Sequence, residues 1–265
     1  SQLRARWCPF DPVRRRGLER IYREQDMNNL DDVSSEYLPN AATAIENDLM
    51  LHWYPKRIVK RFGHCGTLLE LGLGHGFTAS IFNAACDRQV IVEGSGVVIE
   101  HFRESHPDFP AELVQGFFET YQPEESFDVI IMGFILEHVD APGLLLSRYR
   151  NFLKPGGRIF IAVPNAKSLN RRLGLELGII DDIYSLNEND LALGHKRQYC
   201  RDTLRAELAE HGFSVAHEEG IYLKPLPLSV LKTLPDFEAN LQAMLKVGVD
   251  FPDLCVGLLM EVTPQ

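Results

Sequence analysis

Residues Leu68–Gly76 read Leu-Leu-Glu-Leu-Gly-Leu-Gly-His-Gly, and this stretch decides the fold. It is a short apolar run that contains one acid and passes into a turn with glycines at alternate positions. A second apolar run, Val90–Val92, follows after a helical pattern and ends in another acid, Glu93. Near-continuous apolar strands separated by helices predict a parallel sheet that is covered on both faces.

The turn and the second acid together predict a nucleoside-type ligand. Gly72, Gly74 and Gly76 have no Cβ, so the backbone there can approach a ligand closely. Glu93, at the tip of the next strand, can accept hydrogen bonds from both ribose hydroxyls. A dinucleotide fingerprint needs a third glycine where Phe77 stands, and the chain has no Gly-x-x-x-x-Gly-Lys-Ser/Thr loop. An adenosine-type cofactor other than NAD is therefore favoured.

Composition limits the class of protein. The 265 residues are 45% apolar and 24% charged, which is typical of a soluble globular chain with room for one large α/β domain. A net charge of −10 argues against general nucleic-acid binding, and the longest apolar run is too short to span a bilayer. Residues 1–20 are rich in arginine and the five cysteines are scattered. These features predict no signal peptide and a cytoplasmic location.

Strands and helices alternate from Thr67 onward. Candidate strands are Thr67–Leu73, Gln89–Gly94, Ala111–Phe118, Phe127–Ile135, Arg158–Pro164, Phe213–Leu223 and Cys255–Val262. Candidate helices are Gly76–Cys86, Val97–Ser105, Ala141–Leu153, Asp202–His211 and Thr233–Val247. Pro142 suits a first helical turn, and Gly212 suits a helix C-terminus. Lys154–Gly157 predicts a turn that separates the preceding helix from the next strand.

The pattern Glu70-x-Gly72-x-Gly74-x-Gly76, with Glu93 one strand later, resembles motif I of class I S-adenosylmethionine-dependent methyltransferases. The resemblance covers about residues 45–262 and includes the turn at Leu153–Gly157. It implies an α/β, Rossmann-like fold whose seven-stranded, mostly parallel sheet carries helices on both faces and an antiparallel last strand. It also implies S-adenosylmethionine as the cofactor and S-adenosylhomocysteine as its product.

The resemblance also implies the cofactor site. The first acid would lie near the cofactor's amino group, the glycines would pass under ribose and methionine, and the second acid would hold the ribose. The implied residues are Glu70, Gly72, Gly74, Gly76, Glu93, Gly94, Ser95, Phe117, Phe118, Glu119, Met132 and Gly133. Aromatic rings stand at 117 and 118, where the family usually has Asp-Ala, so adenine would be held by a backbone N–H and by packing, with Glu119 as a polar fallback.

Residues Phe127–Val139 resemble the fourth strand of these enzymes and the Glu-His pair that often follows it. The resemblance places His138 near the transferred methyl group, as one of two candidate catalytic residues. Two alternatives remain open from the residues alone. His138 can pack on the sheet edge, and Glu137 can simply stabilise a helix start through the helix dipole.

The segment 165–200 is long for a connection between a strand and its helix, which favours a functional insertion. Ser185–Glu188 has the form of a capping box, so we expect a helical lid. Gly194–Tyr199 resembles a Gly-His-x-Arg-x-Tyr element of small-molecule and sugar-type methyltransferases. His195, the second candidate catalytic residue, would be a general base or would orient the acceptor. A structural His–Arg pair that fastens the lid is the alternative.

Polar side chains suggest how the acceptor is bound. Arginine recognises carboxylate or phosphate through paired hydrogen bonds, so we expect a polar, anionic acceptor. The candidate substrate-binding residues are Tyr22, Tyr37, Glu137, Asn165, Arg171, Arg197 and Tyr199. In the N-terminal segment, Trp53 and Tyr54 are explained at least as well by packing of an amphipathic helix.

The sequence therefore predicts an N-terminal helical cap over residues 1–66 and a methyltransferase domain over 67–265 with the lid inserted at 165–200. The expected activity is O- or N-methylation of a polar small molecule, such as a sugar or another specialised metabolite. No metal, nucleic acid or membrane partner is expected, and a homodimer stays open. A quinone-type O-methyltransferase and a catalytically silent partner subunit are the alternatives. Neither Asn/Asp-Pro-Pro-Tyr nor Pro-Cys occurs after the fourth strand, so base methylation is disfavoured.

Overall fold

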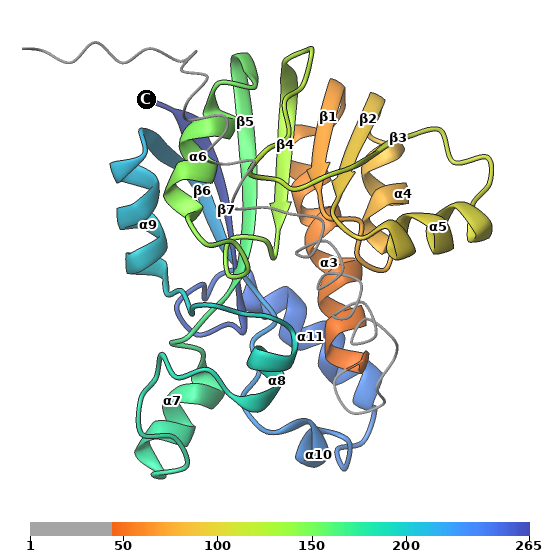
Figure 1. The fold of residues 1–265 in the computed structure, drawn as a ribbon. Coiled ribbons are helices and arrows are strands. Elements are labelled where there is room, and N and C mark those ends of the chain that lie inside the picture. The colour runs from red at the N-terminus through yellow and green to blue at the C-terminus, as the bar shows by residue number, and fades with distance from the viewer. Residues whose placement is uncertain (1–43) are drawn as a thin grey trace, which may run out of the picture.

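A computed structural model describes residues 44–265 of the chain, and these form a seven-stranded sheet with helices packed on both faces (Figure 1). The strand order is β3-β2-β1-β4-β5-β7-β6. The strands are β1 (Cys65–Leu71), β2 (Cys86–Glu93), β3 (Glu112–Gln115), β4 (Phe127–Gly133), β5 (Leu153–Pro164), β6 (Phe213–Ile221) and β7 (Gly257–Pro264). β7 pairs antiparallel with both β5 and β6, and every other pairing is parallel. The expected sheet and its antiparallel last strand are confirmed.

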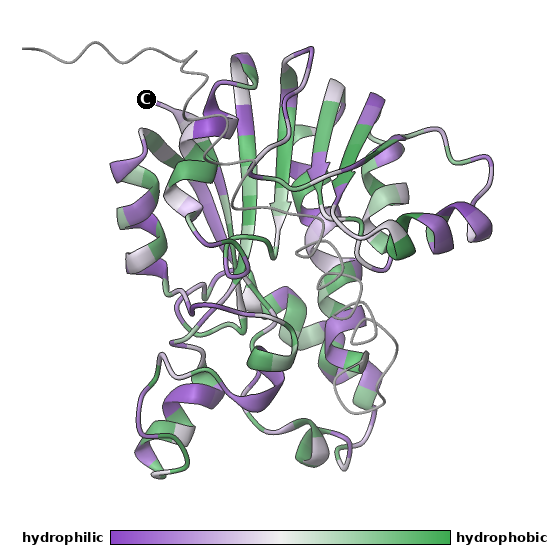
Figure 2. Cartoon of the chain, in the orientation of Figure 1, coloured by the Kyte–Doolittle hydropathy of each residue, from purple (hydrophilic) through white to green (hydrophobic). Residues whose placement is uncertain are grey.

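Helices of the described residues cover both faces of this sheet, and others lie beyond one end of its strands (Figure 1). They are α3 (Ala44–Phe62), α4 (Phe77–Asn83), α5 (Gly96–Ser105), α6 (Pro142–Arg150), α7 (Leu169–Glu176), α8 (Glu188–Ala192), α9 (Arg201–Glu210), α10 (Leu228–Leu231) and α11 (Phe237–Gly248). α6 and α9 pack on one face, whereas α3, α4 and α11 pack on the other. Figure 2 shows apolar residues concentrated along the central strands, with hydrophilic residues on the outer helices.

Alternation along each strand divides the core between the two faces. Leu69 and Leu71 of β1 contribute to the apolar cluster under α6 and α9, whereas Leu68 contributes to the cluster under α3 and α11. Because successive strand residues point to opposite faces, both sides of β1 must be apolar to be buried. Glu70 points to the same face of the sheet as Leu68. It is buried there and is therefore a polar exception within the core.

Local signals place some element boundaries correctly. Pro142 occupies the first turn of α6, and Gly212 follows α9 with a φ of 78°. Several other boundaries differ from the sequence expectation, among them the end of β3 and the start of the last helix. β3 ends at Gln115, because residues 117–121 form a turn in which the Phe117 carbonyl accepts bonds from two backbone amides. The last helix begins only at Phe237.

The turn predicted at Lys154–Gly157 lies inside strand β5. The pairing of β4 with β5 is irregular here, because Phe127 pairs with Leu153 and Val129 with Arg158. The extra residues on β5 therefore form a bulged segment and do not end the strand. A Cβ at Gly157 would lie 2.9 Å from the Lys154 carbonyl oxygen, so the bulge needs a glycine.

The predicted capping box at Ser185–Glu188 is wrong by two residues. Asn187 is the N-cap of α8, and its side chain accepts a 2.9 Å bond from the amide of Asp190. In return, Oδ2 of Asp190 accepts a 2.9 Å bond from the amide of Asn187. The hydroxyl of Ser185 instead donates to the carbonyl of Asp182. The helical character of segment 165–200 is nonetheless confirmed by α7 and α8.

Across residues 44–265, no helix combines the length and the apolar character that crossing a membrane requires.

Candidate functional site

The glycine turn between β1 and α4 lies beside the point where the strand order reverses. Strands β2 and β3 extend to one side of β1, and the remaining strands extend to the other. After β1 the chain therefore continues toward one edge of the sheet, and after the neighbouring strand β4 it continues toward the opposite edge. Ligands of open α/β sheets bind outside the carboxyl ends of the strands at such a reversal. The sheet therefore places the turn where a ligand is expected.

The three glycines of the turn have different structural roles. Their φ angles are 81° at Gly72, 49° at Gly74 and 74° at Gly76, in the left-handed region that favours glycine. A Cβ on Gly76 would lie 2.6 Å from Phe102, so packing disfavours a side chain there, whereas one on Gly72 would make only a tight contact of 3.1 Å with Ile135. A Cβ on Gly74 would meet no atom within 4 Å. Gly74 therefore presents open space above the turn.

Glu93 joins the end of β2 to the glycine turn. Its Oε2 accepts a 2.9 Å hydrogen bond from the amide of Leu73, and its Oε1 accepts a 2.8 Å bond from the amide of Ser95. Ser95 also caps α5, where its hydroxyl oxygen accepts a 3.2 Å bond from the amide of Val98. Each carboxylate oxygen can accept a further bond, so Glu93 is held in place and still able to bind hydroxyl groups.

Glu70 is almost fully buried between β1, β2 and α4. Its carboxylate accepts a 2.7 Å bond from Nε2 of Gln89 and a short bond from the hydroxyl of Thr78. Burial raises the pKa of Glu70 to about 8, and the two hydrogen bonds act in the opposite direction. The carboxylate thus ties the first turn of α4 to the sheet beneath the glycine turn. Its expected contact with a cofactor amino group stays a prediction.

The adenine-side candidates follow β3. Phe118 is half-buried against the core, and its carbonyl accepts a 2.9 Å bond from the hydroxyl of Tyr149. The ring of Phe118 comes within 4.0 Å of a Cβ placed on Gly72, so it faces the glycine turn. Phe117 begins the turn that follows β3, and Glu119 lies within this turn. The structure therefore places the ring of Phe118 at the glycine turn, and its contact with adenine stays a prediction.

The end of β4 is enclosed by helix α3. The hydroxyl of Tyr54 lies against Gly133 so closely that no Cβ fits there, and the ring of Tyr54 packs edge-on against Phe134 at 5.5 Å. Phe134 has a φ of 58°, which marks a sharp turn at the strand end. Burial, followed by the charges of Glu70 and Glu137, raises the pKa of Tyr54 well above its usual value. Met132, the neighbouring candidate, is fully buried in the core.

The two candidate catalytic histidines lie together. The rings of His138 and His195 are 4.8 Å apart in an edge-to-face arrangement, although 56 residues separate them in sequence. Nε2 of His138 lies 4.0 Å from Oε1 of Glu137, and Nδ1 of His195 lies 3.3 Å from Oδ1 of Asp190. Burial, with a smaller effect of His195, lowers the pKa of His138 to about 4. Burial raises the pKa of Glu137 to about 8.

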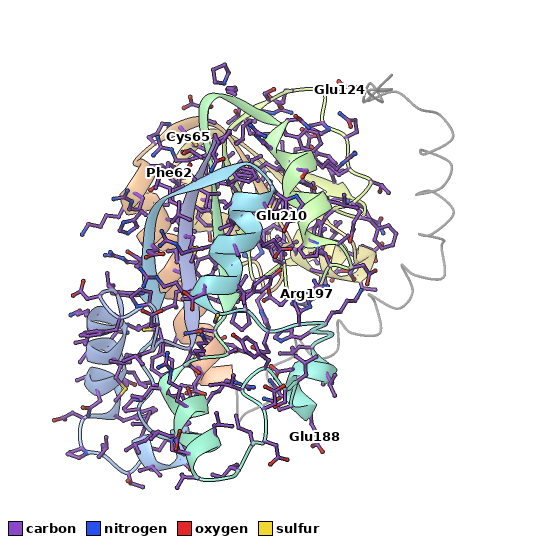
Figure 3. All side chains as sticks on the ribbon, turned by 90° about the vertical axis from the view of Figure 1, so that its left-hand side faces the viewer. Phe62, Cys65, Glu124, Glu188, Arg197 and Glu210 are labelled. Atoms are coloured by element: carbon purple, nitrogen blue, oxygen red, sulfur yellow. The ribbon has the colours of Figure 1, made fainter. Side chains whose placement is uncertain are left out.

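Two arginines predicted to bind the acceptor hold the lid segment in place. Arg197 donates to the carbonyls of Leu136, Val139 and Asp140 at the end of β4. In Figure 3, Arg197 lies between α8, which carries Glu188, and α9, which carries Glu210. Arg171 donates to the carbonyls at positions 183 and 185 within the lid. Most of their donors are thus bonded to backbone, and acceptor binding by either side chain stays a prediction.

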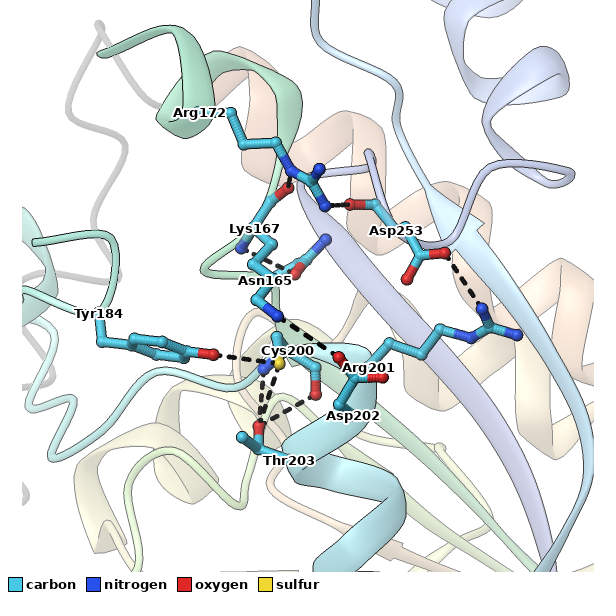
Figure 4. Close-up of polar contacts among 9 residues, drawn as sticks. All are labelled: Asn165, Lys167, Arg172, Tyr184, Cys200, Arg201, Asp202, Thr203 and Asp253. Atoms are coloured by element: carbon cyan, nitrogen blue, oxygen red, sulfur yellow. Dashed lines mark hydrogen bonds and ion pairs between the residues drawn. The ribbon is translucent and has the colours of Figure 1, made fainter. Parts of the chain in front are cut away.

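Asn165 and Tyr199 join the two ends of the lid. They form a parallel bridge, and Nδ2 of Asn165 donates a 2.8 Å bond to the carbonyl of Cys255. The hydroxyl of Tyr199 donates a 2.7 Å bond to Glu207 on α9. Figure 4 shows the surrounding contacts, in which the hydroxyl of Tyr184 points at the sulfur of Cys200 at 3.2 Å. The lid is therefore anchored where it leaves and rejoins the sheet.

Some predicted residues lie outside the described ones, and some functional residues escaped the sequence reasoning. Tyr22 and Tyr37, with most of the N-terminal cap, belong to residues 1–43. Gln89 opens an apolar run, and a polar residue at that place is a signal for a buried hydrogen bond. Asp190 lies five residues before His195, and its contact with His195 depends on how the chain turns after α8.

The profile of the methyltransferase domain family matches residues 40–218, about two thirds of the chain. The chain belongs to the methyltransferase domain family. It is 28% identical over 112 residues to the cypemycin N-terminal methyltransferase of a Streptomyces species, covering 41% of this chain and 46% of the relative. It is 26% identical over 168 residues to the ubiquinone biosynthesis O-methyltransferase of Rhodopseudomonas palustris, covering 60% and 62%. The chain thus spans about half to three fifths of those relatives.

The solved structures of similar proteins agree with the fold of this methyltransferase. One is the 1,6-didemethyltoxoflavin-N1-methyltransferase of Burkholderia thailandensis, solved with its substrate and S-adenosylhomocysteine. The two chains superpose with a TM-score of 0.58 at 16% identity, over 90% of each. At this identity the match supports the fold alone, and it agrees with the sheet order and the antiparallel β7 described above.

Proposed function

We propose that this methyltransferase uses S-adenosylmethionine to methylate an oxygen or nitrogen atom of a polar small molecule in the cytoplasm. A sugar or another specialised metabolite is the favoured acceptor class. The proposal is carried by one observation: Glu93 lies against an open glycine turn at the reversal point of the sheet. The relatives named as an N-terminal methyltransferase and as an O-methyltransferase support methyl transfer and leave the acceptor atom open.

The residues present fit such a cofactor. The open side of Gly74 leaves room for a ligand to lie on the backbone, and Glu93 retains acceptor capacity for two ribose hydroxyls. Phe118 faces the same turn and offers an apolar surface for adenine. When bound, S-adenosylmethionine supplies a methyl group that sulfonium activates for direct displacement. The chain's own contribution is then position and electrostatics, and no covalent nucleophile is required.

We assign acceptor binding to the edge of the sheet beyond β4. Glu137, His138 and His195 meet there, below the lid at 165–200. His138 stays neutral at physiological pH, because its pKa is lowered to about 4, chiefly by burial. His195 is oriented by Asp190, 3.3 Å away. A neutral imidazole can accept a hydrogen bond from an acceptor hydroxyl or amine, which aligns the acceptor atom with the methyl group.

Calorimetric titration with S-adenosylhomocysteine tests the cofactor assignment. We expect binding by the wild type and at least a tenfold loss, about 1.4 kcal/mol, in Glu93→Ala. Glu112→Ala is the matched control, since it removes an exposed acid that pairs with Arg88 on the sheet edge. NADH should not bind. If S-adenosylhomocysteine fails to bind the folded wild type, the chain is better explained as a silent partner subunit.

A quinone-type O-methyltransferase is a second candidate, and two observations favour it. One relative acts in ubiquinone biosynthesis. In addition, Leu173, Leu177 and Ile179 on α7 and the following turn expose 42%, 72% and 73% of their surface. Such side chains could hold the lid against an apolar acceptor or a lipid surface. Methylation of a water-soluble catechol that rises with addition of lipid vesicles would favour this candidate over the polar acceptor.

A further inference from the structure

Three metal-ligand side chains converge at the edge of the sheet beyond β4. Glu137, His138 and His195 each present one ligand atom, and these atoms all lie within 4.8 Å of one another. The first two follow β4 directly, whereas His195 comes from the end of the lid. A metal site needs at least three histidine, cysteine or acidic side chains with ligand atoms close together. Within residues 44–265, this cluster meets that requirement.

The carboxylate of Glu137 has no partner that explains its position. Its side chain is 0% exposed, and within the described part of the chain neither carboxylate oxygen makes a hydrogen bond. Burying a carboxylate without a partner costs several kcal/mol, so such groups in proteins are normally paired or bound to a metal. Nε2 of His138 lies 4.0 Å from this carboxylate, and within residues 44–265 no lysine or arginine forms an ion pair with it.

One ring nitrogen of each histidine lies near a group of the lid, although Nδ1 of His195 makes no hydrogen bond within the described residues. Nδ1 of His195 lies 3.3 Å from Asp190, whose own position is fixed by the capping box of α8. Nδ1 of His138 faces the backbone of Gly194, where a Cβ would lie 3.9 Å away. Nε2 of His138 therefore points toward Glu137. A ligating histidine generally gives its second nitrogen to a carboxylate or backbone carbonyl, which fixes its tautomer and its ring orientation.

Backbone contacts hold the two contributing segments together. The amide of Lys196 donates a 2.8 Å bond to the carbonyl of Glu137, and the amide of His195 donates a 2.9 Å bond to the carbonyl of Asp190. Arg197 adds a 2.8 Å bond to the carbonyl of Leu136. The three side chains are thus presented from a fixed framework. A tetrahedral zinc ion would set the three ligand atoms about 3.4 Å apart, so atoms that now lie within 4.8 Å of one another would move closer together when the ion binds.

We propose that Glu137, His138 and His195 bind one divalent transition-metal ion, with Zn²⁺ the best match to two imidazoles and one carboxylate. Catalytic zinc sites use three such protein ligands and leave the fourth position open. The metal site itself stands on the geometry alone. Its role in catalysis rests on the proposed function, and it replaces the expectation from sequence that no metal is bound.

In that role Glu137, His138 and His195 would hold the ion, which would act as a Lewis acid and lower the pKa of an acceptor hydroxyl, whose proton would leave to water. The acceptor oxygen would then form the bond to the methyl carbon while the carbon–sulfur bond breaks and its electrons leave with S-adenosylhomocysteine. This arrangement favours a hydroxyl acceptor over an amine, because it supplies a reactive oxygen near neutral pH.

Metal titration of the chelator-treated protein tests the site directly. We expect one equivalent of Zn²⁺ to bind in calorimetry, and one equivalent of Co²⁺ to give visible absorption bands of a low-symmetry site. Glu137→Gln and His195→Ala should each weaken the affinity at least tenfold, and Asp190→Asn should weaken it by about tenfold through its effect on His195. His64→Gln is the matched control, because His64 forms an exposed pair with Asp87 at 2.9 Å.

The outcomes separate this inference from the proposed function. Equal Zn²⁺ binding by the wild type and Glu137→Gln, or no binding by the wild type, would overturn the metal site. S-adenosylhomocysteine titrations on the same samples check that each variant is folded and test the cofactor site independently. If Glu137→Gln does not fold, His138→Ala removes another ligand and answers the same question. Metal binding without S-adenosylhomocysteine binding would refute the proposed function and leave the metal site standing.

Discussion

Gln89 of β2 donates a 2.7 Å hydrogen bond to the buried carboxylate of Glu70 on the neighbouring strand β1. A short bond from Thr78 reaches the other oxygen of the same carboxylate. This contact joins both strands and the first turn of α4 directly beneath the glycine turn. The carboxylate nevertheless remains poorly solvated, and its pKa is raised to about 8. The consequence is a measurable dependence of folding stability on pH.

We predict that Glu70→Gln makes stability less dependent on pH. Between its usual pKa of 4.5 and about 8, the folded Glu70 retains a proton that the unfolded chain has lost. Stability from this group therefore falls as pH rises through that window, by up to about 1.4 kcal/mol per pH unit. Urea unfolding at pH 5, 6, 7 and 8 should show a smaller fall in the variant. Glu112→Gln, an exposed control, should follow the wild type, and a parallel Glu70→Gln curve would contradict the prediction.

Helix α3 is fastened to the sheet by an ion pair whose loss should be costly. Arg57 makes two 2.7 Å bonds to Glu219, and the side chain of Glu219 is 1% exposed. Among residues 44–265, Arg57→Ala leaves that carboxylate with His217, at 3.2 Å, as its remaining ion-pair partner, and should lower the free energy of unfolding by about 2–3 kcal/mol.

The matched variant for this prediction is Arg61→Ala. Arg61 pairs with the buried carboxylate of Glu261, which keeps a 2.7 Å bond to Arg158 when Arg61 is removed. Its loss should therefore cost less than about 1 kcal/mol. Equal midpoints in chemical denaturation for the Arg57 and Arg61 variants would show that the Arg57–Glu219 pair is not special.

Gly74→Ala should separate cofactor binding from folding. The new methyl group meets no protein atom within 4 Å, so the variant should lose only about 1 kcal/mol for its left-handed backbone. Affinity for S-adenosylhomocysteine should fall about tenfold or more, because the methyl group enters the space left for the ligand. Gly178→Ala is the control. It has a φ of 67° and open space, but it lies at the end of α7. Unchanged affinity in Gly74→Ala would move the cofactor away from this turn.

His195→Ala should lower turnover by roughly two to four orders of magnitude once an acceptor is known, with affinity for S-adenosylhomocysteine unchanged. The expectation follows from the position of His195 beside His138 and Asp190, on the acceptor side of the site. His64→Ala, which removes an exposed histidine, should leave turnover unchanged. Unaltered single-turnover rates in His195→Ala would remove this residue from the reaction.

Several parts of the site could be predicted from local sequence. The alternation of apolar strands and helices placed the sheet, and the spacing of Gly72, Gly74 and Gly76 located the turn, because these depend on neighbours in the chain. Glu93 was identified for the same reason, since an acid after a strand must lie at the sheet edge. Boundaries that depend on tertiary contacts were less accurate. The bulge at Lys154–Gly157 forms only because β4 pairs alongside.

The sequence by itself determined the architecture, the glycine turn and the acid beside it, because periodicity and backbone sterics act over a few residues. Only the tertiary structure decided which polar groups meet. His195 approaches Glu137 and His138 because Arg197 and the amide of Lys196 bond to the backbone beyond β4. Gln89 reaches Glu70 because β1 and β2 are neighbours in register. Such meetings depend on contacts between segments far apart in sequence, and local patterns carry no information about them.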